Sequence, residues 1–118
     1  MPSPTASIVI CTRNRARVFH ETCDALLSID ETGFEWEVVI VDNASTDGTV
    51  DVVRDRFSWA EIVALEENVG FAAGNNVGLR RAKGRHMVLL NSDTVVLPDA
   101  LESCVRFLDD HPDVGVCA

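Results

Sequence analysis

No apolar run in this sequence approaches the length of a membrane-spanning segment, and the first residues, MPSPTAS, lack the basic and apolar pattern of a signal peptide. Basic residues are scarce, since 10 Lys and Arg stand against 19 Asp and Glu, for a formal net charge of −9. That balance argues against nucleic acid as the main partner. The four cysteines include no C-x-x-C pair, so we expect reduced thiols in a cytoplasmic protein rather than a disulfide framework or a metal cluster.

The motifs of several common site chemistries are also missing. There is no G-x-G-x-x-G after an apolar segment, no Walker loop for phosphates and no G-x-S-x-G nucleophile elbow. The three histidines lie far apart in the sequence and lack the spacing of metal ligands. Dinucleotide binding through a glycine-rich turn, P-loop chemistry and serine hydrolysis therefore fit this sequence poorly.

What the sequence does have is an alternation of short apolar and amphipathic segments. Its 118 residues, 47% of them apolar, predict one domain over residues 1–118. This alternation predicts an α/β fold: a Rossmann-like, mostly parallel sheet with helices on both faces. The Val and Leu run in MVLLNSDT predicts a central strand buried on both faces. Strands are expected at residues 7–12, 37–41, 61–65, 87–94 and 114–117, with four helices between them. The strand at residues 61–65 is expected nearer a sheet edge.

Polar side chains follow three of these strands where each strand ends. They are Thr12, Arg13 and Asn14, then Asp42 and Asn43, and finally Asn91 and Asp93. The carboxyl ends of parallel strands lie at one edge of a sheet, so these groups converge if their strands are adjacent. The mixture suits a ligand with a phosphate and hydroxyl-rich or base-like parts. Asp93 is a candidate ligand for Mg²⁺ or Mn²⁺, which one carboxylate can hold together with substrate phosphates.

Two clusters hold seven of the ten basic residues, namely Arg13, Arg15 and Arg17, and Arg80, Arg81, Lys83 and Arg85. Most are expected on solvated surface, although an acidic protein can use such clusters to attract a small anion.

Residues 68–83, NVGFAAGNNVGLRRAK, look helical in their second half yet carry Gly70, Gly74 and Gly78 at four-residue spacing. Glycine within a helix costs roughly 1 kcal/mol relative to alanine. Close approach of the backbone to another element, or to a ligand, would offset that cost. The sequence leaves both explanations open.

The segments SIVICTRNR, EVVIVDNASTDGT, ENVGFAAGNNVGLRRAKG and MVLLNSDTVV follow one another along the chain. In this order and spacing they resemble family 2 glycosyltransferases of the GT-A fold, and the resemblance runs over residues 7–118. The patterns G-F-A-x-G-N-N and L-N-x-D-T resemble the rhamnosyltransferase-like branch. The resemblance implies an inverting transferase that passes a sugar from a nucleoside-diphosphate donor, such as dTDP-rhamnose or a UDP-sugar, to a glycan or lipid-linked acceptor.

The resemblance also implies roles for individual residues. Asp42 matches the carboxylate that hydrogen-bonds a uracil or thymine ring, and Asp47 is expected to cap a helix. Asn91 matches a residue that faces the ribose or sugar, and Asp93 matches the metal ligand. The donor-binding positions as a set are Thr12, Arg13, Asn14, Asp42, Asn43, Asn68, Gly70, Asn75 and Asn91.

The sequence departs from the commoner family pattern at two positions. Asn91 stands where the first carboxylate of D-x-D is usual, and Asn75 stands where an arginine is often found. Metal dependence would therefore rest nearly on Asp93 alone. The family's catalytic base and acceptor site lie in a second half that is absent here, so no catalytic residue is assigned. We expect an N-terminal fragment that is inactive in transfer.

A different class remains open: a non-catalytic nucleotide-sugar-binding module, or a subunit completed by another chain. The edge of the strand expected at residues 114–117 could then pair with a second copy in a homodimer. A reading frame that continues well past Ala118 would favour the transferase, and a natural stop there would favour the module. A sugar nucleotidyltransferase is disfavoured because TRNRARVF, after the first strand, contains no glycine.

Overall fold

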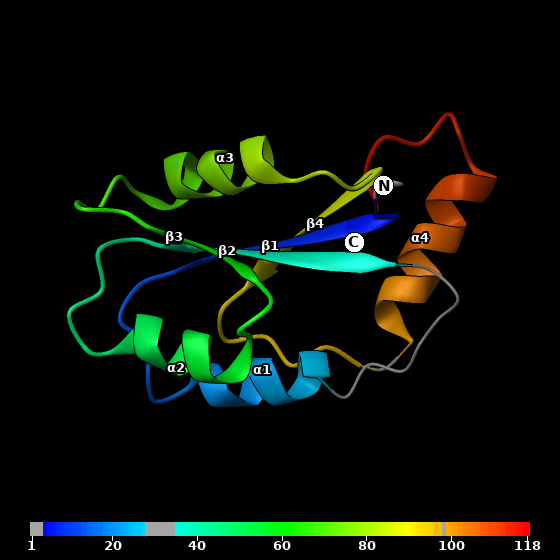
Figure 1. The fold of residues 1–118 in the computed structure, drawn as a ribbon. Helices are drawn as coiled ribbons and strands as arrows, with labels where there is room; N and C mark the ends of the chain where they lie inside the picture. The colour runs from blue at the N-terminus through cyan, green and yellow to red at the C-terminus, as the bar shows by residue number, and fades with distance from the viewer. Residues whose placement is uncertain (1–3, 28–34, 98) are drawn as a thin grey trace.

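The computed structural model describes residues 4–27, 35–97 and 99–118, which form one sheet flanked by helices (Figure 1). The strands pair in the order β3-β2-β1-β4, and every pair is parallel. The predicted α/β fold is confirmed, and β3 lies at a sheet edge as expected. The elements in chain order are β1 (Ala6–Thr12), α1 (Phe19–Leu27), β2 (Trp36–Asp42), α2 (Thr49–Arg56), β3 (Glu61–Ala64), α3 (Phe71–Arg81), β4 (His86–Asn91) and α4 (Ala100–Asp110).

Side chains alternate between the two faces of the sheet because successive residues of a strand point to opposite sides. One face packs against α1, α2 and α4, and its core includes Ile8, Ile10, Val38, Ile40, Phe19, Leu26, Val53, Phe57 and Leu101. The other face is covered by α3, which contacts β1 and β2. Figure 1 shows α1 and α2 side by side on one side of the sheet and α3 on the other.

The backbone of α3 rests directly on the two central strands. A Cβ atom built on Gly74 would lie 2.5 Å from Cys11 Sγ, and one on Gly78 would lie 2.4 Å from Val9 Cγ1. Close helix–strand packing therefore accounts for these two glycines. Gly70 differs, because it precedes the helix with a φ of 90°, a conformation that favours glycine.

Within the described sheet, β4 is an edge strand and not the central strand predicted from its apolar run. It pairs with β1 on one side, and the helix that covers β1 and β2 leaves its outer face open. Met87 and Leu89 are 51% and 56% exposed, whereas Val88 and Leu90 pack against the core. An apolar run indicates that a strand can be buried, but it does not encode the strand's lateral position in the sheet.

No strand forms at residues 114–117, contrary to the prediction. The chain after α4 is irregular, and Val116 is 85% exposed. A strand needs a neighbour for its backbone hydrogen bonds, and none of the four strands of the described sheet pairs with this segment. The predicted homodimer required a strand at residues 114–117, so the structure gives it no support. Cys117 lies in this irregular tail, outside any strand, and all four cysteines are free thiols.

Candidate functional site

The carboxyl ends of β1, β2 and β4 meet at one edge of the sheet, as predicted. The register places Thr12 beside Asp42 and Cys11 beside Asn91. Figure 1 shows the loops after β1, β2 and β3 gathered at the same end of the sheet. Groups that are 30 to 80 residues apart in the sequence thus lie at one edge.

Asp42 and Thr12 carry buried polar atoms without a partner. Asp42 is 3% exposed and Thr12 is 2% exposed. Asp42 Oδ2 accepts a hydrogen bond from Ser45 N at 3.0 Å, but Asp42 Oδ1 and Thr12 Oγ1 have no partner within the part of the chain that the structure describes. Buried polar atoms are nearly always hydrogen-bonded, so two such exceptions on adjacent strands point to a ligand.

Reciprocal hydrogen bonds join the loop after β1 to the loop after β2. Asn14 N donates to Ser45 Oγ, and Asn14 Oδ1 accepts from Thr46 N, both at 2.8 Å. Asn14 and Ala44 have φ values of 52° and 61°, which are uncommon for residues with a Cβ. The side chain of Asn14 thus orders the loops themselves, whereas the sequence predicted it only as a ligand contact.

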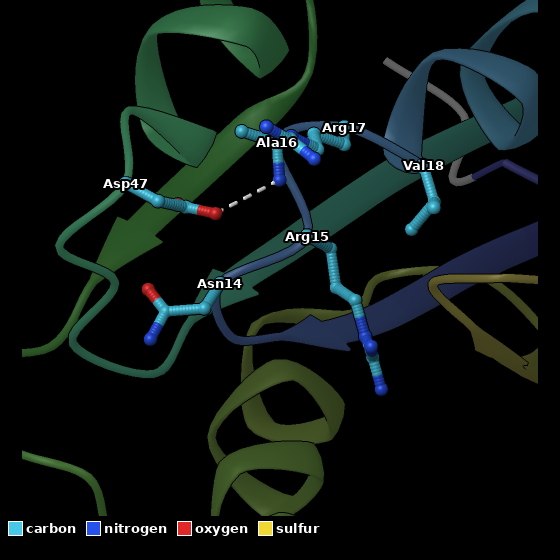
Figure 2. Close-up of a pocket in the computed structure, with 6 residues that line it drawn as sticks. All are labelled: Asn14, Arg15, Ala16, Arg17, Val18 and Asp47. Atoms are coloured by element: carbon cyan, nitrogen blue, oxygen red, sulfur yellow. Dashed lines mark hydrogen bonds between the residues drawn. The ribbon is translucent and has the colours of Figure 1, made fainter.

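Asp47 adds a second connection between the same loops. Its Oδ2 accepts from Ala16 N at 3.1 Å, the bond drawn in Figure 2, and its Oδ1 accepts from Thr49 N at 3.1 Å. The hydroxyl of Thr49 also donates to this carboxylate, which lowers the pKa of Asp47. The N-cap position of α2 belongs to Gly48, so Asp47 acts as a bridge between loops as well as a partner of the first helical residue.

Arg15 is a residue that the sequence grouped with a basic cluster but did not single out. It lines two adjoining cavities, one formed by residues 14–18 with Asp47, the other by Cys11, Phe71, Asn91, Ser92 and Asp93. Figure 2 shows its side chain extending away from Asp47. Arg13 instead donates from Nη1 to Asn43 O at 3.2 Å. The only sequence signal for Arg15 was its membership of an arginine-rich loop.

The second basic cluster lies away from this edge, at the end where α3 finishes and β4 begins. Arg81 pairs with Glu61 at 2.7 Å and Arg85 pairs with Asp109 at 2.8 Å. Arg85 N also donates to Pro4 O, beside the start of β1. Arg81 and Arg85 therefore behave as paired surface charges, and the positive charge at the site comes from the loop after β1.

The end of β4 forms one wall of the second cavity. Ser92 O accepts from Thr22 Oγ1 at 2.9 Å, which fixes this end to α1. Asn91 and Asp93 are exposed beside it. Cys11, beside Asn91 on the adjacent strand, lines the same cavity. Burial raises the pKa of the Cys11 thiol, against a smaller lowering by Asn43, so Cys11 is a poor nucleophile at neutral pH.

The remaining predicted positions lie on the glycine-rich segment, and their polar atoms bind its backbone. Asn68 Oδ1 accepts from Gly70 N at 3.0 Å. Asn75 is 6% exposed, and its Nδ2 donates to Phe71 O at 3.2 Å within α3. Phe71 itself lines the second cavity, so the first turn of α3 faces the site.

The oxygen atoms at the end of β4 are of the kind that bind a hard divalent cation. Asp93 offers a carboxylate and Asn91 an amide oxygen, and both are accessible. Among residues 4–27, 35–97 and 99–118 no group of three or more His, Cys, Asp or Glu could hold a metal ion. An ion at this place would therefore need oxygens from the ligand as well.

The fold and the polar strand ends place the chain among α/β domains that bind a ligand at the carboxyl edge of a parallel sheet. The sequence pattern described as Glycosyl transferase family 2 matches residues 7–118, and the chain belongs to this family. TuaG of Bacillus subtilis (strain 168), which is named as a glycosyltransferase of teichuronic acid biosynthesis, is 35% identical over 108 residues. That match covers 89% of this chain and 42% of TuaG.

Two solved structures share the fold. Residues 1–349 of Staphylococcus aureus TarS in complex with UDP-GlcNAc match with a TM-score of 0.83 and 28% identity, over 92% of this chain and 32% of that one. The mannosyltransferase PcManGT of Pyrobaculum calidifontis, in complex with GDP-Man and Mn²⁺, matches with a TM-score of 0.85 and 33% identity. This match covers 98% of the chain and 35% of PcManGT. The predicted GT-A nucleotide-binding architecture is thereby confirmed.

The chain spans about two fifths of TuaG and about a third of the two solved structures. No helix in the described part of the chain is both long enough and apolar enough to cross a membrane.

Proposed function

We propose that this chain binds the nucleoside-diphosphate part of a sugar donor, and that the whole protein transfers the sugar with inversion to a glycan or lipid-linked acceptor. The observation that carries the proposal is the pair of buried, unpartnered atoms on adjacent strands, Asp42 Oδ1 and Thr12 Oγ1. The UDP-GlcNAc and GDP-Man complexes of the two structural relatives support it.

Asp42 would recognise the base. Its free carboxylate oxygen is suited to accept from a ring N–H, which uracil, thymine and guanine all present. A dTDP-sugar such as dTDP-rhamnose, a UDP-sugar and a GDP-sugar are therefore the donors to compare. Thr12, Arg13, Asn14 and Asn43 would lie around the base.

The diphosphate and the sugar would extend toward the end of β4. Arg15 lines the same cavity as Asn91 and Asp93, so its guanidinium would neutralise phosphate charge there. Asn91 would face the ribose or sugar, with Asn68, Gly70 and Asn75 framing the other side. A divalent cation, when bound by Asp93, would stabilise the leaving diphosphate, the task that transfer requires at this half of the protein.

Calorimetric titration of the purified chain with UDP, dTDP and GDP, each with and without Mn²⁺, tests the proposal. We expect at least one of these nucleotides to bind with a one-to-one stoichiometry. A folded chain that binds none of the three would contradict the proposal.

Asp93→Asn is expected to abolish the enhancement of nucleotide binding by Mn²⁺ while leaving metal-free binding within about twofold. An amide keeps the size of the side chain but supplies no charge to a hard cation. The measurement is the same titration, with Asp113→Asn as the control because Asp113 is an exposed carboxylate in the tail. Equal Mn²⁺ enhancement in Asp93→Asn and in the control would remove Asp93 as the metal ligand.

Arg15→Ala is expected to weaken diphosphate binding about tenfold at low salt, a loss typical of one charge-assisted contact. The difference from wild type should shrink as ionic strength rises, because salt screens an exposed charge. Arg54→Ala is the matched control, since Arg54 is an exposed arginine on α2. If the two variants lose affinity equally, Arg15 acts through general charge and does not contact the phosphates.

A further inference from the structure

Asn43 is buried where three loops of the site meet, and all of its polar groups are hydrogen-bonded within the protein. The residue is 3% exposed. Its backbone N donates to Thr12 O at 2.8 Å, and its backbone O accepts from Arg13 Nη1 at 3.2 Å. Its side chain reaches the third loop, where Oδ1 accepts from Val69 N and Nδ2 donates to Gly70 O, both at 2.9 Å.

We propose that Asn43 is a positioning residue whose side-chain amide locks the loop before α3 to the loops after β1 and β2. This inference rests on the proposed function, because the three loops are those assigned to the sugar donor. Asn43 was predicted as a ligand contact, but its side-chain amide is already occupied by Val69 and Gly70. Its effect on the donor would therefore pass through the loops it holds.

The two side-chain hydrogen bonds of Asn43 require an amide. Val69 N needs an acceptor and Gly70 O needs a donor, and a single neutral amide supplies both. Gly70 O also accepts from Gly74 N at 3.0 Å, the bond that begins α3. An ionised carboxylate at position 43 would keep the first contact but would press a negative oxygen against the Gly70 carbonyl.

Asn43→Asp tests this requirement, because the ionised carboxyl lacks the donor and the protonated carboxyl regains it. Near neutral pH the variant is expected to bind the nucleotide that wild type prefers about tenfold more weakly, the cost of leaving a buried group without its partner. Burial and the adjacent Asp42 both favour protonation of the introduced carboxyl, whereas Arg13 opposes it. The Cys11 thiol, 3.9 Å from Asn43 Nδ2, is the other titratable group that faces it.

The affinity of Asn43→Asp relative to wild type should therefore recover as the pH falls from about 8 to about 5.5, across the range in which a buried carboxyl titrates. Asn76→Asp is the matched control, because Asn76 is an exposed asparagine on α3 and the change introduces the same charge. Its affinity relative to wild type should not change with pH. If the affinity of Asn43→Asp relative to wild type equals that of Asn76→Asp at both pH values, the proposal would be overturned.

Amide hydrogen exchange without nucleotide separates the lock from the proposed function. Exchange at Gly74, whose N–H donates to the Gly70 carbonyl that the carboxylate would repel, is expected to be faster in Asn43→Asp than in Asn76→Asp near neutral pH. Slow exchange of the Asn43 side-chain amide in wild type, compared with that of Asn76, gives the same test if Asn43→Asp does not fold. Equal rates in these comparisons would overturn the lock. If the exchange rates differ as expected but the chain binds no nucleotide, Asn43 holds the loops together without any role at a donor site. That result would also overturn the proposed function itself.

Discussion

Asp42→Asn is expected to weaken nucleotide binding about 100-fold, because a hydrogen bond to a buried charged acceptor contributes about 1.5–3 kcal/mol. The amide oxygen can still accept the hydrogen bond that Ser45 N now donates to Asp42 Oδ2 at 3.0 Å. The amide nitrogen would then replace the unpartnered Asp42 Oδ1 and would point a donor at the ring N–H of the base. Two donors would face each other, so the loss should exceed that of deleting a contact at the surface.

Titration calorimetry with UDP, dTDP and GDP measures this loss, and thermal unfolding shows whether the variant remains folded. Asp55→Asn is the control, because Asp55 is an exposed carboxylate on α2 and its change removes the same charge. We expect the control to bind within about twofold of wild type, since surface substitutions away from a site have small effects. A folded Asp42→Asn variant with wild-type affinity would reject Asp42 as the base contact.

Gly78→Val is expected to lower the free energy of unfolding by about 3 kcal/mol, near the upper end of the usual cost of overpacking a core. A Cβ added at this position would lie 2.4 Å from Val9 Cγ1 and 3.2 Å from Val41 Cγ2. Both neighbours belong to the central strands and are fully buried, so neither can move aside without disturbing the sheet. A higher intrinsic helix propensity than that of glycine offsets less than about 1 kcal/mol of this cost.

Urea-induced unfolding measures this effect, and two further variants identify its cause. Asn76→Val introduces the same side chain at an exposed position of α3, where we expect a change within about 0.5 kcal/mol. Val9→Ala combined with Gly78→Val should be more stable than the sum of the single changes predicts, because Val9→Ala removes the atom that clashes. Additive losses in the double variant would show that the contact between α3 and β1 is not the cause.

Much of the fold could be predicted because hydrophobic periodicity is a local property of the sequence. The runs SIVICT and EVVIV became β1 and β2, and the amphipathic segments that follow them became α1 and α2, which pack side by side on one face of the sheet. The convergence of Thr12 with Asp42 also followed, since parallel strands bring their carboxyl ends to the same edge. For the glycines of α3 the sequence offered two explanations, and packing on β1 and β2 explains Gly74 and Gly78.

The apolar runs of two segments led to predictions that were wrong. MVLLN became the edge strand β4, whose Met87 and Leu89 are exposed, and residues 114–117 formed no strand. Both errors have one cause: apolar character shows that a segment can be buried, whereas a strand's place in a sheet depends on which neighbour it pairs with.

The sequence was sufficient to predict the chain order of four strands and four helices, the parallel sheet and the end of the sheet at which ligand-type residues gather. These features depend on local periodicity and on the handedness of crossovers. The folded chain decided which of those residues keep a free polar atom and which hold the loops together. Asp42 keeps an unpartnered oxygen, whereas the equally polar Asn14 and Asn43 use their side chains to tie loops together. Hydrogen bonds between residues 26 to 32 positions apart make that distinction, and no local pattern encodes which partner a polar side chain will meet.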